Sequence, residues 1–283
     1  MMKTFPEPDF TVRDVLDACA AGLRDRGLAR RLDGVLPALE EAELDYASLG
    51  PDARLFEILS TDDVDTTVSS AEMSALYKGT LARQGSRARR FYDRLKTAAP
   101  NDICPLCGQR VVKTLDHYLP KSTYPGLALT PINLVPACSD CNKFKLDRQP
   151  AGAEDQTLHP YFDDVDGDSW LFAEIRESSP PAAVFSVHPP PSWDAITAAR
   201  LRIHFQTFGL GELYAAQAGS EMVSIRFALA EAAGARGVEG VQALLAHQAR
   251  TRSLAARNSW VAALYSALAE SVWFCSEGYG LLG

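Results

Sequence analysis

Apolar residues recur at helical spacing along the first third of the chain, with charged residues in the gaps between them. The clearest series is Val12, Val15, Leu16, Cys19 and Leu23. A recurrence every three or four residues gives a helix one apolar face, so the pattern predicts helices from about residue 11 to residue 96. Gly50-Pro51 breaks the pattern, and a second helical run extends from Leu76 to Lys96.

The helical periodicity is lost between Asn101 and Gln149, where proline, glycine, cysteine and short apolar runs replace it. After an acidic stretch, residues 170–175 and 183–187 predict two short strands. From Trp193 to Cys275 the chain is helical again. Two apolar stripes mark this part: Met222, Ile225 and Leu229, and then Trp260, Leu264, Leu268, Val272 and Cys275. Such stripes face a core or dock another chain.

Together these patterns predict an α+β fold that is mostly α. We expect an N-terminal helical region at residues 1–97 and a small central module at residues 98–168. The C-terminal region, residues 169–283, begins with a short β-hairpin and continues as helices.

Composition places the chain among ordinary globular proteins, with 47% hydrophobic and 23% charged residues. No apolar run approaches the ~20 residues that span a bilayer. The opening residues, MMKTFPEPDF, lack the charged and apolar segments of a signal peptide. We therefore expect a cytoplasmic protein with no membrane partner.

Charge is unevenly distributed along the chain. The formal net charge of −8 argues against nucleic-acid binding by bulk charge, yet residues 78–148 hold 13 basic and 5 acidic side chains. A basic segment in an acidic protein indicates a local site for a polyanion. The candidate phosphate contacts are Arg87, Arg89, Arg90, Lys121, Lys143, Lys145 and Arg148. The alternative is a solvated surface.

Four of the six cysteines form two CxxC pairs, Cys104/Cys107 and Cys138/Cys141, separated by 30 residues. Two thiolates on a tight turn reach one tetrahedral zinc ion, and four of them leave no position for water. The pattern predicts a structural Zn²⁺ that holds together a module too small to bury a firm core. Unmetallated cysteines or a redox pair would also fit the spacing, although no thioredoxin-like βαβ pattern surrounds the motif.

The residues between and after the cysteine pairs carry a second motif. It reads Asp116-His117, then Asn133-Leu134, then Cys138-x-x-Cys141-Asn142-x-x-Lys145. This string resembles the HNH motif of the ββα-metal nucleases. The resemblance implies a zinc-stapled ββα module in which a β-hairpin carries Asp116 and His117. The following helix starts near Cys138 and presents Asn142.

The same resemblance implies a role for each motif residue in phosphodiester hydrolysis. His117 is the general base, because a neutral imidazole can take the proton of water near pH 7. Asp116 and Asn142 bind the catalytic metal, and Asn133 braces the loop that aims the base. Asn142 stands where the motif often has histidine. Its oxygen donor suits Mg²⁺ or Mn²⁺ and puts catalytic Zn²⁺ or Ni²⁺ in doubt. The family products are 5′-phosphate and 3′-hydroxyl ends.

His159 follows the module in the string Leu158-His-Pro-Tyr-Phe-Asp163. It is a candidate supporting group that packs against the active site. A turn capped by the histidine is equally compatible with the string.

The wider layout is similar to the HNH effectors encoded beside an ABC-type ATPase in Septu and some retron antiphage systems. The strings that carry this similarity include Arg89-Arg90-Phe91-Tyr92, Asn258-Ser259-Trp260 and Ala263-Leu264-Tyr265. The resemblance implies an antiphage endonuclease that cuts DNA and pairs with an ATPase.

Three rival functions stay open from the sequence. The substrate could be RNA, such as tRNA, because no reader of the 2′-hydroxyl is visible. The chain could be a non-catalytic zinc-knuckle subunit that binds nucleic acid. It could also be a structural subunit of an ATPase complex.

Overall fold

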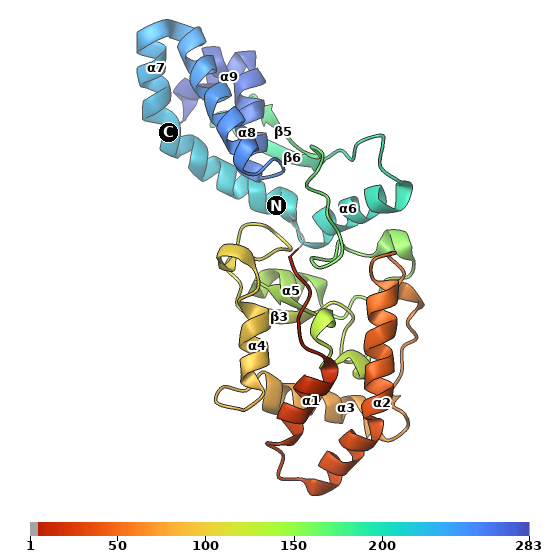
Figure 1. The fold of residues 1–283 in the computed structure, drawn as a ribbon. Coiled ribbons are helices and arrows are strands. Elements are labelled where there is room, and N and C mark those ends of the chain that lie inside the picture. The colour runs from red at the N-terminus through yellow and green to blue at the C-terminus, as the bar shows by residue number, and fades with distance from the viewer. Residues whose placement is uncertain (1–4, 283) are drawn as a thin grey trace. The chain divides into compact units, whose positions relative to one another are not determined.

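The computed structural model describes residues 5–282 (Figure 1). Residues 1–4, the start of the segment without signal-peptide features, and residue 283 lie outside the described residues. The described residues form two compact units, 5–164 and 165–282. The boundary expected at residue 97 therefore falls inside the first unit.

Helices are the main regular elements of the first unit. They are α1 (Val12–Ala20), α2 (Arg26–Leu49), α3 (Ser70–Leu76) and α4 (Arg89–Lys96), with a small ladder of β1 (Asp63–Val64) and β2 (Val68–Ser69) between α2 and α3. The predicted break is confirmed, because α2 ends one residue before Gly50.

One hydrophobic core joins these helices to the central strands. The apolar stripe of α1 is buried and packs with Leu32, Val35 and Leu39 of α2. Leu115 and Leu134, from the central module, belong to the same cluster. The helical region and the module thus share their buried surface, which explains why they form one unit.

The second predicted helical run is not continuous. After α3, the segment Tyr77–Leu81 forms a π-helical turn, and α4 begins only at Arg89. Gly85, with φ of +76°, supplies the left-handed conformation that turns the chain between them. Arg83 and Arg87 therefore lie in a connection, and the prediction of one helical run from Leu76 to Lys96 is wrong.

The central module contains two paired strands and a helix. Strand β3 (Thr114–His117) pairs antiparallel with β4 (Leu134–Ala137), and Asp116 stands opposite Val135. Helix α5 (Ser139–Lys145) follows, and Cys138 caps it by accepting a hydrogen bond from the Cys141 amide. The structure confirms the predicted strand that carries Asp116 and His117, and it confirms the predicted helix start near Cys138.

The second unit contains a hairpin and four helices. The predicted strands are confirmed as β5 (Leu171–Arg176) and β6 (Ala182–Val187), which pair antiparallel. The helices are α6 (Ala195–Thr207), α7 (Leu210–Ala255), α8 (Trp260–Glu270) and α9 (Val272–Ser276). Non-helical dihedral angles at Arg236 and Gly237 interrupt α7. No helix between residues 5 and 282 is long and apolar enough to cross a membrane.

The two C-terminal stripes are buried in part. Met222, Leu229, Leu264, Leu268 and Cys275 are buried, as the pattern predicts. Val272 is 77% exposed, so its assignment to the core is wrong. The extended backbone of Ser271 separates α8 from α9, so the helical phase of the stripe does not continue to Val272.

Candidate functional site

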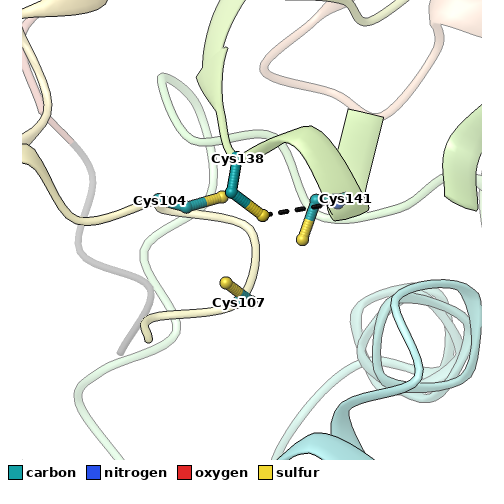
Figure 2. Close-up of side chains that lie close together, drawn as sticks. All are labelled: Cys104, Cys107, Cys138 and Cys141. Carbon is teal, nitrogen blue, oxygen red and sulfur yellow. Dashed lines mark hydrogen bonds between the residues drawn. The ribbon is translucent and has the colours of Figure 1, made fainter. Parts of the chain in front are cut away.

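The four CxxC cysteines converge at one point of the first unit. Cys104 and Cys107 lie on a loop that the bridge between Ile103 and Val111 closes, and Cys138 and Cys141 lie at the start of α5. All four are buried, and their sulfur atoms lie within 4.8 Å of one another. Figure 2 shows the four side chains gathered around a common centre.

This cluster has the donor set of a structural zinc site. Sulfurs bound tetrahedrally at 2.3 Å from zinc are separated by about 3.8 Å, which is compatible with the observed spread. The Arg110 amide donates to Cys107 Sγ at 3.4 Å, and the Cys141 amide donates to Cys138 Sγ at 3.3 Å. Such donors stabilise thiolates. The cysteines are thus positioned to bind a metal ion, and four thiolates are consistent with zinc.

A separate cavity of about 220 Å³ lies beside β3 and α5. Polar side chains dominate its lining, including Asp116 and His117 from β3 and Asn142 from α5. Lys121 and Tyr77 also line this cavity. The structure therefore brings together the predicted base, both predicted metal ligands and one predicted phosphate contact.

Asp116 is buried and paired with a lysine from the facing helix. Lys145 Nζ lies 3.2 Å from Asp116 Oδ2 and donates a hydrogen bond of 2.6 Å to the carbonyl oxygen of His117. Burial raises the pKa of Asp116, and the Lys145 charge opposes that effect. Because Lys145 is only 5% exposed, the expectation that it meets phosphate at the surface does not fit its position.

His117 is held in one orientation. Its Nε2 lies 3.0 Å from the carbonyl oxygen of Ala128. A carbonyl only accepts, so Nε2 carries the proton and Nδ1 carries the lone pair. Burial lowers the pKa of His117 to about 3, with a further contribution from Lys121. The imidazole is therefore neutral at physiological pH, the state that a general base needs.

Asn133 is fully buried and closes the connection between β3 and β4. Its Oδ1 accepts from the Leu119 amide at 2.7 Å. Its Nδ2 donates to the Leu119 carbonyl at 3.0 Å and to the Leu127 carbonyl at 3.1 Å. Leu127 immediately precedes Ala128, whose carbonyl orients His117. This geometry matches the bracing role expected from the sequence, and a role in catalysis stays a prediction.

The remaining predicted phosphate contacts do not line the cavity. Arg89 pairs with Asp93 and Arg148 pairs with Asp155, whereas Arg87, Arg90 and Lys143 are exposed.

The cavity wall also contains residues that the sequence did not single out, and Tyr77 and Asp147 are two of them. Tyr77 lies in a helical apolar pattern that carries no catalytic signal. Asp147 lies two residues beyond the HNH-like string, where no motif position points to it.

His159 lies in an aromatic cluster outside the cavity lining. Its ring stacks on Phe162 and contacts Tyr118, and Nε2 lies 3.0 Å from the Tyr46 hydroxyl. Its Nδ1 accepts a hydrogen bond from the Tyr161 amide. This geometry favours the capped turn, and Tyr118, the neighbour of His117, links His159 to the site.

Comparison with known proteins supports a nuclease assignment for this module. Residues 104–148 match the HNH endonuclease family. That range contains the four cysteines, Asp116, His117, Asn133 and Asn142. The chain is also 28% identical over 234 residues to Protein ea31 of Escherichia phage lambda, and the alignment covers 79% of each chain. No solved structure matches the chain.

Proposed function

We propose that the protein is a metal-dependent endonuclease that hydrolyses phosphodiester bonds in DNA. The observation that supports this function most directly is the cavity itself. There, a neutral imidazole of fixed tautomer lies beside a buried carboxylate and an amide side chain. With β3, β4 and α5 around it, the module would be a ββα-metal site of the HNH type in which asparagine, Asn142, takes the last motif position.

In this proposal His117 acts through Nδ1. The hydrogen bond from Nε2 to Ala128 keeps Nδ1 unprotonated, so Nδ1 accepts the proton of the attacking water. Asn133 acts indirectly, because its hydrogen bonds hold the Leu127 carbonyl just before Ala128. Because its pKa is lowered, the His117 imidazole is neutral over the whole physiological range.

Asp116 and Asn142 would hold the divalent ion. Lys145 pairs with Asp116 Oδ2, and both Asp116 and Asn142 line the cavity. Carboxylate and amide oxygens are ligands that Mg²⁺ and Mn²⁺ accept. When bound, such an ion supplies charge stabilisation for the phosphate and the leaving oxygen.

The antiphage role and the ABC-type ATPase partner remain predictions from the resemblance of the wider layout. Neither the HNH match nor the phage relative bears on them. They concern when the enzyme acts, and the cleavage reaction proposed above does not depend on them.

Substitution of His117 by alanine is expected to slow cleavage by about 10²- to 10⁴-fold, the usual contribution of a general base. The assay incubates duplex DNA, single-stranded DNA and RNA separately with each protein, with and without added Mg²⁺ or Mn²⁺. The matched control is His247→Ala, at an exposed histidine of the second unit.

Equal cleavage by wild type and His117→Ala would overturn the assigned mechanism. Cleavage of RNA alone would replace DNA as the substrate while keeping the mechanism. Absence of cleavage of every substrate, with nucleic acid still bound, would favour a non-catalytic zinc-knuckle subunit.

A further inference from the structure

The basic residues of the segment 78–148 fall into two groups, those that pair with a carboxylate of the protein and those that do not. Five of the 13 basic residues in the segment 78–148 form ion pairs with carboxylates. They are Arg89, Arg94, Arg110, Lys145 and Arg148. Their charge is already compensated within the protein, so they are poor candidates for binding an incoming anion.

Lys121 differs from these residues. It is half-buried in the cavity wall beside Asp116 and His117, and its ammonium lies 5.4 Å from the centre of the Tyr77 ring. Among residues 5–282 it has no ion-pair partner, although Asp116 and Asp147 lie near enough to favour its charged form. A partly desolvated cation without a paired carboxylate is costly unless an anion binds to it.

Lys78 brings a second positive charge close to Lys121, from the turn that also carries the cavity residue Tyr77. Burial lowers the pKa of Lys121, and the neighbouring Lys78 lowers it further. Lys78 is exposed and, within the described part of the chain, also lacks an ion-pair partner. Repulsion between two adjacent ammonium groups opposes folding, and a bound anion would relieve it.

The π-helical turn Tyr77–Leu81 creates this arrangement. It places Tyr77 in the cavity wall, where its ring packs edge-on against the His117 ring, with 4.5 Å between the ring centroids. Lys78 follows directly and is thereby kept close to the site. Single-turn π-helices are frequent at functional sites, where they re-aim side chains at a cost in regular helical hydrogen bonding.

We infer that Lys78 and Lys121 form a subsite for one phosphate group of a nucleic-acid backbone, next to the bond that is cleaved. This inference rests on the proposed function for its biological meaning. The subsite recognises the phosphate and reads no base, because contacts to phosphate oxygens carry no direct sequence information. It therefore binds backbone from any sequence.

Binding is best tested without cleavage, in the His117→Ala background and with no added divalent ion. The probes are a fluorescent duplex of about three helical turns, the corresponding single strands, and inorganic phosphate as competitor. Lys121→Gln and Lys78→Gln are each expected to weaken duplex binding about tenfold or more, as loss of a hydrogen bond to a charged group does. The negative slope of log affinity against log salt should become shallower by about 0.9 for each phosphate contact that is lost.

Two further variants separate binding from structure. Lys121→Arg keeps the charge and is expected to recover most of the affinity, which a merely structural role for the lysine would not produce. Lys113→Gln is the matched control, since this exposed lysine precedes β3 and does not line the cavity. It should change affinity by less than about twofold.

Unchanged affinity and salt slope in Lys121→Gln and Lys78→Gln would overturn the subsite, even if the enzyme cleaves DNA as proposed. Conversely, lysine-dependent binding in a protein that cleaves no nucleic acid would preserve the subsite and overturn the nuclease proposal. The two ideas therefore fail in different experiments.

Discussion

Replacement of Cys138 by serine is expected to unfold the module from Cys104 to Lys145 and to abolish any cleavage activity. Cys138 supplies one sulfur of the four-cysteine cluster and also caps α5. Structural zinc in small modules contributes about 10–16 kcal/mol of binding free energy, and that energy is folding energy. This loss is as large as the net stability of a typical domain, which is about 5–15 kcal/mol.

The effect should be local as well as large. β3 and α5 carry Asp116, His117 and Asn142, and the cluster ties the start of α5 to the loop before β3. Hydrogen exchange should show protection lost first over residues 114–117 and 134–145, while the helical hairpin of α1 and α2 retains part of its protection. Zinc per chain, measured by mass spectrometry, should fall below that of the wild type.

Cys19→Ala is the matched control for this experiment. Cys19 is also a buried thiol, but it lies on α1 in the hydrophobic core and belongs to no metal cluster among the described residues. It should lower stability modestly and leave the zinc content at the wild-type level. A Cys138→Ser protein that folds normally with full zinc content would contradict the assignment of the cluster.

The sequence was most informative where short spacing determines geometry. Two CxxC turns can place four thiols together only if the chain between them returns, and the pairing of β3 with β4 provides that return. The strands β5 and β6 likewise follow from local patterns of apolar residues. The helix start near Cys138 followed instead from the resemblance to the HNH motif. The spacing within each CxxC pair and the patterns of β5 and β6 involve residues close in sequence, which a single sequence displays.

Features that depend on distant neighbours were not predictable. Lys145 and Asp116 pair across the β3–β4 connection and α5, so a lysine at the end of a basic motif looked like a surface phosphate contact. The position of Tyr77 beside His117 depends on a π-helical turn, for which the sequence carries no recognised signal. Val272 illustrates a different limit, because one extended residue at Ser271 shifts the phase of an apparently regular stripe.

Replacement of Lys145 by methionine is expected to lower the free energy of unfolding by about 3–5 kcal/mol, the cost of leaving a buried charge without its partner. Methionine keeps most of the length and the apolar stem of the side chain but removes the ammonium that lies 3.2 Å from Asp116. The hydrogen bond to the His117 carbonyl is lost as well. Chemical denaturation without added Mg²⁺ or Mn²⁺ measures the change.

Two comparisons identify the ion pair as the cause. Lys143→Met, at an exposed position of the same helix, should have little effect on stability. The double variant Asp116→Asn/Lys145→Met removes both charges and should recover most of the stability, because replacing a buried pair by neutral groups is often close to neutral. A double variant as unstable as Lys145→Met would show that packing, and not charge, is responsible.

The stability of Lys145→Met should also depend on pH in a defined direction. Burial raises the pKa of Asp116 above its value in the unfolded chain, and Lys145 counteracts this shift in the wild type. Without the lysine, the folded pKa rises further, so the folded state binds more protons than the unfolded state. The deficit relative to wild type should therefore be smallest below the unfolded pKa of about 3.9 and should grow as the pH rises through the folded pKa. If the deficit stays constant from about pH 4 to about pH 8, Asp116 does not become an uncompensated charge when Lys145 is replaced. That result would contradict the electrostatic role assigned to the Asp116–Lys145 pair.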